Sequence, residues 1–346
     1  MRLAVVGATG AVGTVMLEVL AERSFPADEV VLFASERSAG RRIPFGGAEL
    51  EVQALTDESV QGFDIAIFSA GGGTSGEWAP RFAAAGAVVV DNSSRWRMED
   101  GVPLVVADVN PEALDSHDGI VANPNCSTMQ MMVPLRPIRD AAGIERLVVT
   151  TMQSVSGTGQ KAIDELRDQT HALLHDQEAE ASVYPHRIAF NVLPQAGSFP
   201  DGGDYTDEEL KLVNETRKIL GDETIGVSAT CTRVPVFVGH SESVNVQTRD
   251  PLSPEECREL LLAAPGIAVL DDPGDGLYPL ATAAAGRDEV LVGRIRSDPS
   301  HERCLNMWIV GDNLRIGAAT NAVMIAERLI ERGLTGSRGT PQEIAP

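Results

Sequence analysis

The glycine-rich segment GATGAVG at residues 7–13 restricts the fold of this chain more than any other feature. It follows an apolar run, Leu3–Val6, with the composition of a buried strand. It leads into Val12–Glu22, where apolar residues recur at helical spacing. Glycines at a strand-to-helix turn let backbone amides approach a pyrophosphate closely. The spacing is G-x-x-G-x-x-G instead of G-x-G-x-x-G, so a tight turn without a ligand is the alternative to a dinucleotide site.

Short apolar runs alternate with helical patterns up to residue 125. Continuous β-branched runs separated by helices predict a mostly parallel sheet that is buried on both faces. The predicted fold class is therefore α/β, with a Rossmann-type dinucleotide-binding domain at the start of the chain. The expected strands are Leu3–Val6, Val30–Ala34, Ile65–Ser69, Ala87–Asp91, Leu104–Val106 and Ile120–Ala122.

The pattern changes after Cys126, where longer strand patterns are interleaved with helical ones. This predicts an α+β domain with an antiparallel or mixed sheet. The expected strands are Arg146–Val155, Gly226–Arg233, Ser243–Thr248, Glu289–Arg296 and Cys304–Val310. A helix should begin near Ser127 and end or kink at Pro134 and Pro137. Further expected elements are helices at Gly159–Gln177, Asp207–Leu220, Pro254–Leu262 and Leu314–Glu331, a surface loop at Ser198–Tyr205 and a frayed tail from Gly333.

Composition excludes several classes of protein. The formal net charge of −22 argues against a nucleic-acid partner, because a phosphate backbone would be repelled. No apolar run is long enough to cross a bilayer, and the N-terminus has no signal-peptide pattern. The four cysteines show no C-x-x-C spacing, so neither a disulfide framework nor a metal site is expected. We expect a cytoplasmic protein of two domains.

The segment NPNCS at residues 123–127 ends an apolar run and opens a new helical pattern. A cysteine at the start of a helix faces unsatisfied backbone N–H groups and the positive end of the helix dipole, which stabilise thiolate over thiol. Cys126 is therefore predicted to be a nucleophile. The other cysteines lie inside strand or helix patterns, where burial in a core is the ordinary explanation: Cys231, Cys257 and Cys304.

A catalytic thiol needs a base, and His240 is the best candidate among the six histidines. It follows an apolar strand that breaks at Gly239, and the residues alone leave a catalytic and a core role equally open. Arg233 could hold a substrate carboxylate with its guanidinium fork or form an interstrand salt bridge. Histidines in polar, acidic surroundings are expected at the surface: His117, His171, His175 and His301.

The end of the second strand bears on the choice of cofactor. A carboxylate there would hold the ribose hydroxyls of NAD, whereas the 2′-phosphate of NADP calls for hydroxyls and a cation. Ser35, Arg37 and Ser38 fit the phosphate, and Glu36 does not. If extended geometry continues, strand alternation puts Glu36 on the opposite side. We therefore expect NADP, with NAD as the alternative.

Six segments together resemble bacterial aspartate-β-semialdehyde dehydrogenases over nearly the whole chain. They are the glycine-rich turn at residues 6–13, DNSSR at 91–95, NPNC at 123–126, QSVSG at 153–157, RVP with GH at 233–240, and GDNLR at 311–315. The resemblance implies a discontinuous NADP-binding domain, residues 1–126 with 313–346. It also implies a catalytic and dimerisation domain at residues 127–312.

The resemblance implies the reductive dephosphorylation of L-aspartyl 4-phosphate by NADPH, which gives L-aspartate 4-semialdehyde and phosphate. This step belongs to the biosynthesis of lysine and diaminopimelate, methionine, threonine and isoleucine. Cys126 matches the thiolate that forms a thioacyl enzyme, and His240 matches the general acid/base. Gln153 matches the residue that orients the thioester, and Asn125 is its neighbour in the acyl pocket.

The binding residues are likewise implied by the resemblance. Arg95 and Lys211 match two cations for the phosphate, Glu208 the acid for the substrate ammonium, and Arg233 the clamp on the α-carboxylate. Without the resemblance, Glu208 and Lys211 would be read as a surface ion pair three residues apart on a helix. The implied cofactor contacts are Gly7, Thr9, Gly10, Ala11, Val12, Gly13, Ser35, Arg37, Ser38, Ser156, Gly157 and Asn313.

The family forms homodimers and sometimes tetramers, so the same is expected here, with a small-molecule substrate and no membrane partner. The closest rival is N-acetyl-γ-glutamyl-phosphate reductase, which uses the same thiol chemistry. Its acetylated substrate needs no ammonium-binding acid such as Glu208. A non-catalytic nucleotide-binding relative is the other alternative, and the presence of both Cys126 and His240 argues against it.

Overall fold

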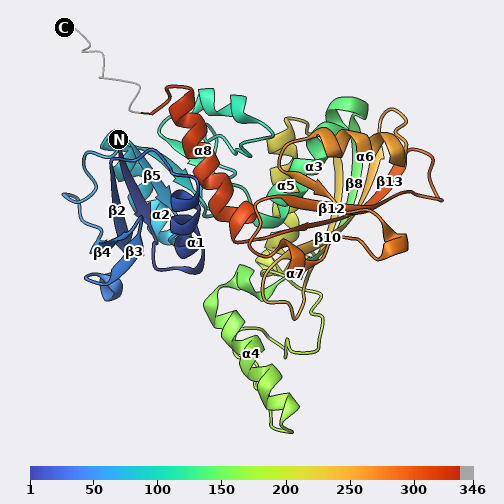
Figure 1. The fold of residues 1–346 in the computed structure, drawn as a ribbon, viewed down its shortest axis with the longest axis horizontal. Coiled ribbons are helices and arrows are strands. Elements are labelled where there is room, and N and C mark those ends of the chain that lie inside the picture. Colours follow the sequence, from blue (N-terminus) through green and yellow to red (C-terminus); the bar gives the residue numbers. More distant parts are fainter. Residues whose placement is uncertain (336–346) are drawn as a thin grey trace. The chain divides into compact units, whose positions relative to one another are not determined.

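The computed structural model describes residues 1–335, which divide into two compact units. The first comprises residues 1–124 and the segment that begins at Ala318, and the second comprises residues 125–317 (Figure 1). The predicted frayed tail from Gly333 falls mostly outside the described residues. Among the described residues, no helix is long and apolar enough to span a membrane.

The first unit is built on a seven-stranded sheet with the order β3-β4-β2-β1-β5-β6-β7. All neighbouring strands run parallel except β3 and β4, which form an antiparallel hairpin. The prediction of a mostly parallel sheet is therefore confirmed. The strands are β1 (Arg2–Val6), β2 (Glu29–Ala34), β3 (Arg42–Phe45), β4 (Ala48–Ala54), β5 (Ile65–Phe68), β6 (Val88–Asp91) and β7 (Ile120–Ala122).

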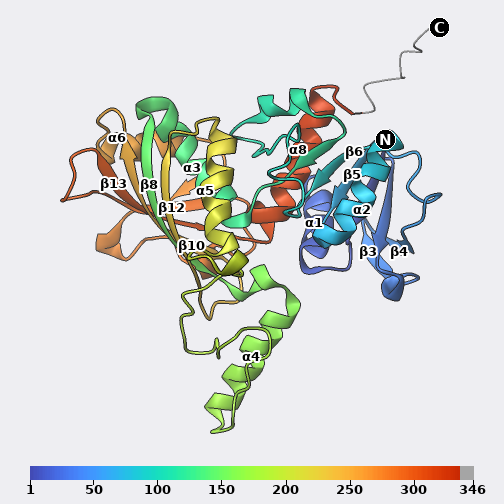
Figure 2. The same cartoon turned by 180° about the vertical axis from the view of Figure 1, so that it is seen from behind.

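Both faces of this sheet are covered by helices. Leu3 and Val5 share an apolar core with α1 (Ala11–Glu22) and α8 (Thr320–Glu331). Their neighbours Ala4 and Val6 belong to a second core with α2 (Gly71–Ala84), which is labelled in Figure 2. Alternate residues of β1 therefore face opposite layers. Burial on both faces explains why these strands read as continuous apolar runs.

Two expectations for this unit are wrong. Leu104–Val106 is not a strand, because only Leu104 forms an isolated bridge, to Ala122. The hairpin of β3 and β4 was missed, because most of its residues are exposed or half-buried and its apolar residues alternate with other residues instead of forming a run. An edge hairpin of this kind lacks the apolar run that marks a buried strand.

The second unit contains a six-stranded sheet with the order β11-β12-β13-β10-β8-β9. Strands β8 and β9 run parallel, as do β11 and β12, and the other neighbours are antiparallel. The predicted mixed sheet is thus confirmed. The strands are β8 (Ile144–Gln153), β9 (Gly226–Arg233), β10 (His240–Thr248), β11 (Ile267–Val269), β12 (Val290–Ser297) and β13 (Cys304–Gly311).

Helices α3 (Cys126–Ala142), α5 (Asp207–Leu220) and α6 (Pro254–Ala263) pack on this sheet, and α4 (Gln160–Leu174) projects away from it (Figure 1). Pro134 and Pro137 lie inside α3, so of the two predicted outcomes, an end or a kink at these prolines, the end is wrong and the kink stays a prediction. Each proline removes one backbone donor, but α3 buries residues around most of its circumference, and this packing maintains the helix. A short helix, α7 (Ala281–Ala284), contacts β13.

The chain leaves and re-enters each unit at one place. Within the first unit, Asn123 Nδ2 lies 3.3 Å from the carbonyl oxygen of Ala318. Within the second, Gly317 packs on Cys126 so closely that a Cβ at Gly317 would lie 2.9 Å from that of Cys126. The helix that was expected from Leu314 begins as a π-helical turn, Arg315–Ala319, and α8 starts after it at Thr320.

Helix α5 begins with a capping box that yields a prediction about stability. The Thr206 hydroxyl accepts from the Glu209 N–H at 3.2 Å, and the Glu209 carboxylate accepts from the Thr206 N–H at 2.8 Å. Thr206→Ala should cost about 1 kcal/mol in the free energy of unfolding. It should therefore lower the melting temperature measured by calorimetry. Thr206→Ser retains the hydroxyl and should melt close to the wild type; equal losses in both variants would contradict the capping role.

Candidate active site

Cys126 is the first residue of α3, and Asn125 caps this helix. Asn125 Oδ1 accepts hydrogen bonds from the N–H groups of Ser127 and Thr128 at 3.0 and 3.2 Å. The predicted helix start is thus confirmed, and an anion on Cys126 would lie at the positive end of the helix dipole. Cys126 is partly exposed, whereas the other three cysteines are buried as expected.

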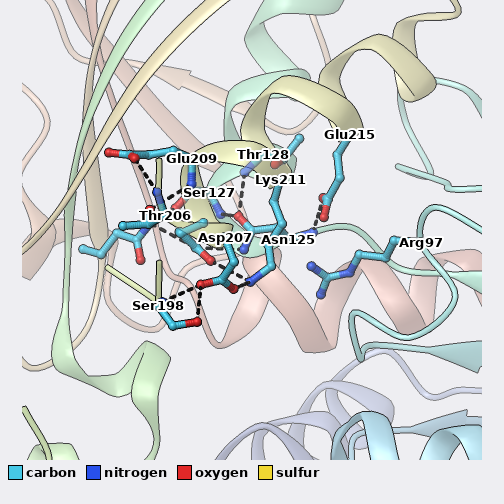
Figure 3. Close-up of polar contacts among 12 residues, drawn as sticks. Arg97, Asn125, Ser127, Thr128, Ser198, Thr206, Asp207, Glu209, Lys211 and Glu215 are labelled. Carbon is cyan, nitrogen blue, oxygen red and sulfur yellow. Dashed lines mark hydrogen bonds and ion pairs between the residues drawn. The ribbon is translucent and has the colours of Figure 1, made fainter. Parts of the chain in front are cut away.

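Side chains from α5 lie beside this helix start (Figure 3), and Gln153 of β8 also contacts it. Asn125 Nδ2 donates to Glu208 Oε1 at 2.8 Å, and Gln153 Nε2 donates to the same oxygen at 3.1 Å. Gln153 also donates to the Ser127 hydroxyl at 3.0 Å. The structure therefore brings together three of the predicted site residues around the first turn of α3. The roles assigned to them in the reaction stay predictions.

Glu208 and Lys211 form a partly buried ion pair, with Nζ 3.2 Å from Oε2, and Lys211 also contacts Asp207 at 2.5 Å. Burial by itself would raise the pKa of Glu208. The charge of Lys211 and the hydrogen bonds from Asn125, Lys211 and Gln153 outweigh burial and lower this pKa below its ordinary value. Burial likewise opposes the charge of Lys211, but the two carboxylates raise its pKa. The pair is therefore charged at neutral pH.

His240 is the first residue of β10 and is completely buried. Its Nδ1 accepts from the backbone N–H of Ser154 at 3.1 Å and contacts the Ser154 hydroxyl at 3.0 Å. Because a backbone N–H can only donate, the proton of the neutral ring is on Nε2. Burial, followed by the positive charge of Arg233, holds the pKa of His240 well below its ordinary value. Nε2 has no hydrogen-bond partner among the described residues.

Gly157 lies beside both His240 and Arg233. A Cβ at this position would lie 3.1 Å from Arg233 Nη1 and 3.2 Å from His240 Nε2. Arg233 Nη1 donates to the carbonyl of Ser154 at 2.8 Å, while its buried Nε has no partner in the described part of the chain. Buried donors of this kind are bonded to protein or water in nearly all folded proteins. Arg233 Nε and His240 Nε2 are therefore available to donate to oxygen atoms of a ligand.

Asn313 joins three segments next to His240. Its Oδ1 accepts from the hydroxyls of Ser154 and Ser156, at 3.0 and 3.1 Å, and from the N–H of Gly239 at 3.0 Å. The predicted residues Ser156 and Asn313 are therefore neighbours. Their predicted contact with a cofactor is not tested by these bonds.

The glycine-rich turn of the first unit has the geometry that a pyrophosphate requires. Gly7 has φ of +91°, and a Cβ at Gly13 would lie 2.1 Å from the carbonyl oxygen of Gly7. Helix α1 starts at Ala11 after Gly10, which has no side chain to cap the amides of the first turn. A cavity of about 500 Å³ lies beside this turn and is lined by Gly7, Thr9 and Gly10 among others. These residues fit a dinucleotide.

The segment after β2 differs from its prediction. Glu36–Ser38 is a 3₁₀ turn, so extended geometry ends at Ser35 and the argument from strand alternation is wrong. Ser35 and Glu36 line the cavity, whereas Arg37 and Ser38 are not among its lining residues. The carboxylate that would favour NAD therefore lies on the cavity side.

Arg95 belongs to the first unit, where its guanidinium pairs with Glu99 at 2.9 Å and stacks on the Trp96 ring at 4.5 Å. Its phosphate-binding role stays a prediction. One histidine prediction is wrong: His117 is buried, and its Nδ1 accepts from the N–H of Gly119 at 3.2 Å. His171, His175 and His301 are exposed, as predicted.

Sequence reasoning missed two residues that contact the site. Ser154 orients His240, and Glu215 accepts from the backbone N–H of Asn125 at 2.6 Å. Glu215 follows Glu208 by seven residues, which places both on one face of α5. That spacing could have identified Glu215, and Ser154 lies in the QSVSG segment at residues 153–157, from which only Gln153, Ser156 and Gly157 were given roles.

Comparisons with known proteins define the class. Residues 2–117 match the model of the semialdehyde dehydrogenase NAD-binding domain, and residues 135–316 match that of the semialdehyde dehydrogenase dimerisation domain. The chain is thus a semialdehyde dehydrogenase with a domain for a nicotinamide dinucleotide.

Individual relatives narrow this class. The aspartate-semialdehyde dehydrogenase of Aquifex aeolicus is 57% identical over 96% of this chain and 99% of its own length. The structure of aspartate semialdehyde dehydrogenase II from Vibrio cholerae complexed with ASA is 50% identical over 95% of this chain and 98% of that one, with a TM-score of 0.91. The enzyme of Candida albicans with NADP is 27% identical over 96% of this chain and 99% of that one, with a TM-score of 0.74. The chain belongs to the aspartate-semialdehyde dehydrogenase family.

Glu242, two residues after His240 on β10, yields a prediction about pH. It is completely buried, neither carboxylate oxygen has a hydrogen-bond partner among the described residues, and burial holds its pKa well above the ordinary value. A raised folded-state pKa stabilises the fold below the unfolded-state pKa. This stabilisation is lost as the pH rises, at up to about 1.4 kcal/mol per pH unit.

Glu242→Gln removes this titration. We expect it to raise the urea midpoint relative to the wild type by more at pH 8 than at pH 5. The exposed Glu259 provides a matched control, since Glu259→Gln should leave both midpoints unchanged. A gain for Glu242→Gln that is equal at the two pH values would contradict the prediction.

Proposed function

We propose that this chain catalyses the NADPH-dependent reductive dephosphorylation of L-aspartyl 4-phosphate to L-aspartate 4-semialdehyde and phosphate. The observation that carries the proposal is the helix start at Cys126, surrounded by Asn125, Gln153 and Glu208. The Vibrio cholerae relative described above, which was solved in complex with ASA, supports the substrate class.

Cys126 is the nucleophile. Its sulfur attacks the acyl carbon, the bond from that carbon to the phosphate oxygen breaks, and phosphate leaves with the electron pair. The positive end of the α3 dipole stabilises the thiolate before the attack. Bound NADPH supplies the hydride that reduces the acyl carbon. The carbon–sulfur bond of the resulting thiohemiacetal then breaks, which releases the aldehyde and restores the thiolate on Cys126.

His240 is the acid/base group, and its Nε2 carries the proton in the neutral ring. This N–H can donate to the substrate oxygen where negative charge develops. Ser154 keeps the ring in this tautomer from the opposite side. Because Arg233 lowers the pKa of His240 further, the ring is neutral when substrate arrives.

The charged groups fit the other parts of the substrate. Arg233 has a buried Nε, without a partner among residues 1–335, for the α-carboxylate, and Glu208 keeps a negative charge for the ammonium. Lys211 offers a cation for the phosphate, and Arg95 is the second phosphate cation. The charge of Glu208 favours an aspartyl substrate over an N-acetylated glutamyl one, which has no ammonium group.

NADP is the proposed cofactor. It binds at the glycine-rich turn through residues 7–13, with Ser35, Arg37 and Ser38 toward the 2′-phosphate and with Ser156, Gly157 and Asn313 toward the nicotinamide. The NADP complex of the Candida albicans relative supports this assignment. Glu36 beside the cavity is the feature that opposes it.

The chain is further proposed to act as a homodimer in the cytoplasm, formed through its second unit. The match to a dimerisation domain over residues 135–316 supports this. One sheet face of that unit carries a cavity of about 370 Å³ lined by Ser243, Arg294, Arg296 and Trp308 among others. Exposed apolar residues next to it, Tyr278 and Leu280, suit burial against a second copy.

A reverse assay tests the function. Purified protein with aspartate semialdehyde, phosphate and NADP should form NADPH only when phosphate is present, and N-acetylglutamate semialdehyde should not replace the substrate. Cys126→Ala should lower kcat at least about 10³-fold, because the covalent route is lost. Cys257 is a matched control: burial raises the pKa of its thiol to about 12, and Cys257→Ala should keep kcat. Activity that survives in Cys126→Ala would disprove the thioacyl mechanism.

The cofactor preference gives a separate prediction. The wild type should show a kcat/KM for NADP at least about tenfold above that for NAD, a difference of about 1.4 kcal/mol. Glu36→Gln removes a negative charge beside the cavity. It should raise the ratio of kcat/KM for NADP to kcat/KM for NAD about fivefold, since a carboxylate in contact with the 2′-phosphate costs roughly 1 kcal/mol. Equal kcat/KM values for NAD and NADP in the wild type would overturn the assignment of NADP.

A further inference from the structure

Helix α5 directs two carboxylates at one residue. Glu208 and Glu215 are seven residues apart, which is close to two turns, and both bind Asn125. Glu208 has a role in the proposed reaction, whereas Glu215 has none. Glu215 is nevertheless only 1% exposed, and Figure 3 shows its carboxylate at the backbone of Asn125.

The bond from Glu215 completes the hydrogen bonding of Asn125. The Asn125 N–H donates to Glu215 Oε2 at 2.6 Å, and its carbonyl accepts from the Met129 N–H at 2.8 Å. Its side-chain oxygen caps α3, and its side-chain nitrogen binds Glu208. Every polar group of the residue that precedes the nucleophile therefore has a partner within the second unit.

The position of this bond is specific. Pro124 has no N–H, so the Asn125 N–H is the only backbone donor of the two residues that precede Cys126. Since an N-cap N–H lies outside the helical ladder, another group must satisfy it. A carboxylate forms a shorter and stronger bond here than a neutral acceptor would. Burying a carboxylate is costly without such bonds, so a carboxylate kept at this peptide indicates a need for a fixed geometry.

We propose that Glu215 is a positioning residue for the nucleophile. By holding the Asn125 peptide, it fixes the backbone from which Cys126 projects and thereby sets the aim of the sulfur at the acyl carbon. The proposal rests on the function proposed above. A misplacement of about 1 Å at a reacting group can cost a factor of about 10² in rate.

Three variants of Glu215 distinguish an effect on the position of the Cys126 sulfur from an effect on the stability of the fold. Glu215→Ala removes the acceptor and should lower kcat about 10- to 100-fold, with KM for aspartate semialdehyde within about threefold of the wild type. Glu215→Asp keeps the charge but withdraws it by one methylene, so it should lower kcat in the same direction. Glu215→Gln retains an oxygen at the right distance and should recover most of kcat, because the neutral bond keeps about half of the strength.

Glu209 provides the matched control on the same helix. It is a buried carboxylate that accepts from the N–H groups of Thr206 and Cys231, and it does not contact Asn125. Glu209→Ala should lower the melting temperature while kcat stays at the wild-type value. A purely structural Glu215 would behave in the same way.

Alkylation of Cys126 by iodoacetamide gives a readout that needs no substrate. The other three cysteines are buried, so the fast phase reports Cys126. Its rate constant should fall in Glu215→Ala and Glu215→Asp and stay near the wild-type value in Glu215→Gln and Glu209→Ala. If the wild type fails to oxidise aspartate semialdehyde, the proposed function falls, and the alkylation rates still decide the role of Glu215.

Wild-type kcat and alkylation rates in folded Glu215→Ala would overturn the proposal. An equal loss of kcat in Glu209→Ala at an equal loss of melting temperature would also overturn it. If Glu215→Ala does not fold, Glu215→Asp and Glu215→Gln decide: a low kcat in the first with recovery in the second supports the proposal, and wild-type values in both refute it.

Discussion

The rest of the site depends on the cap that Asn125 forms at the start of α3, next to Cys126. One side chain, Asn125, caps the helix through its oxygen and joins α5 through its nitrogen. Because Gln153 binds both Ser127 and Glu208, the sheet is tied to the same turn. The residues on either side of Cys126 are therefore held by side chains from both α5 and β8.

Charge in this unit is organised by pairing. Glu208 is buried and keeps its charge because Lys211 and two amides offset the cost of burial. His240 is buried and neutral, because burial and the nearby Arg233 both disfavour its charged form. Glu242 is also completely buried, and burial raises its pKa because no cation offsets the cost among the groups that shift this pKa. Burial thus has a different outcome for each group, according to the charges and hydrogen bonds of its neighbours.

Features with strong local signals could be predicted from the sequence. Helix α5 begins and ends as expected, because the capping box at Thr206 and Glu209 and the left-handed Gly221 are local determinants. Likewise, β9 coincides with the expected strand. The NPNCS segment at residues 123–127 predicts the first turn of α3 with Asn125 and Cys126 in it. It does not predict which residues of other elements lie beside that turn.

The errors arise where tertiary contacts outweigh local preference. Burial maintains α3 across Pro134 and Pro137, and a short 3₁₀ turn re-orients Glu36. His117 looks polar in sequence but is covered by the fold. The spacing of seven residues places Glu215 on the same face of α5 as Glu208, but only the fold shows that this face lies against the Asn125 peptide.

The contacts at the two chain crossings have a consequence for the history of the molecule. Asn123 meets Ala318 within the first unit, and Cys126 meets Gly317 within the second, so each unit has its two cut ends side by side. Residues 125–317 therefore have the topology of an insert within an otherwise continuous nucleotide-binding fold. Such an insert can be gained, exchanged or permuted as one piece without breaking the host sheet. Cys126 is the second residue of this insert.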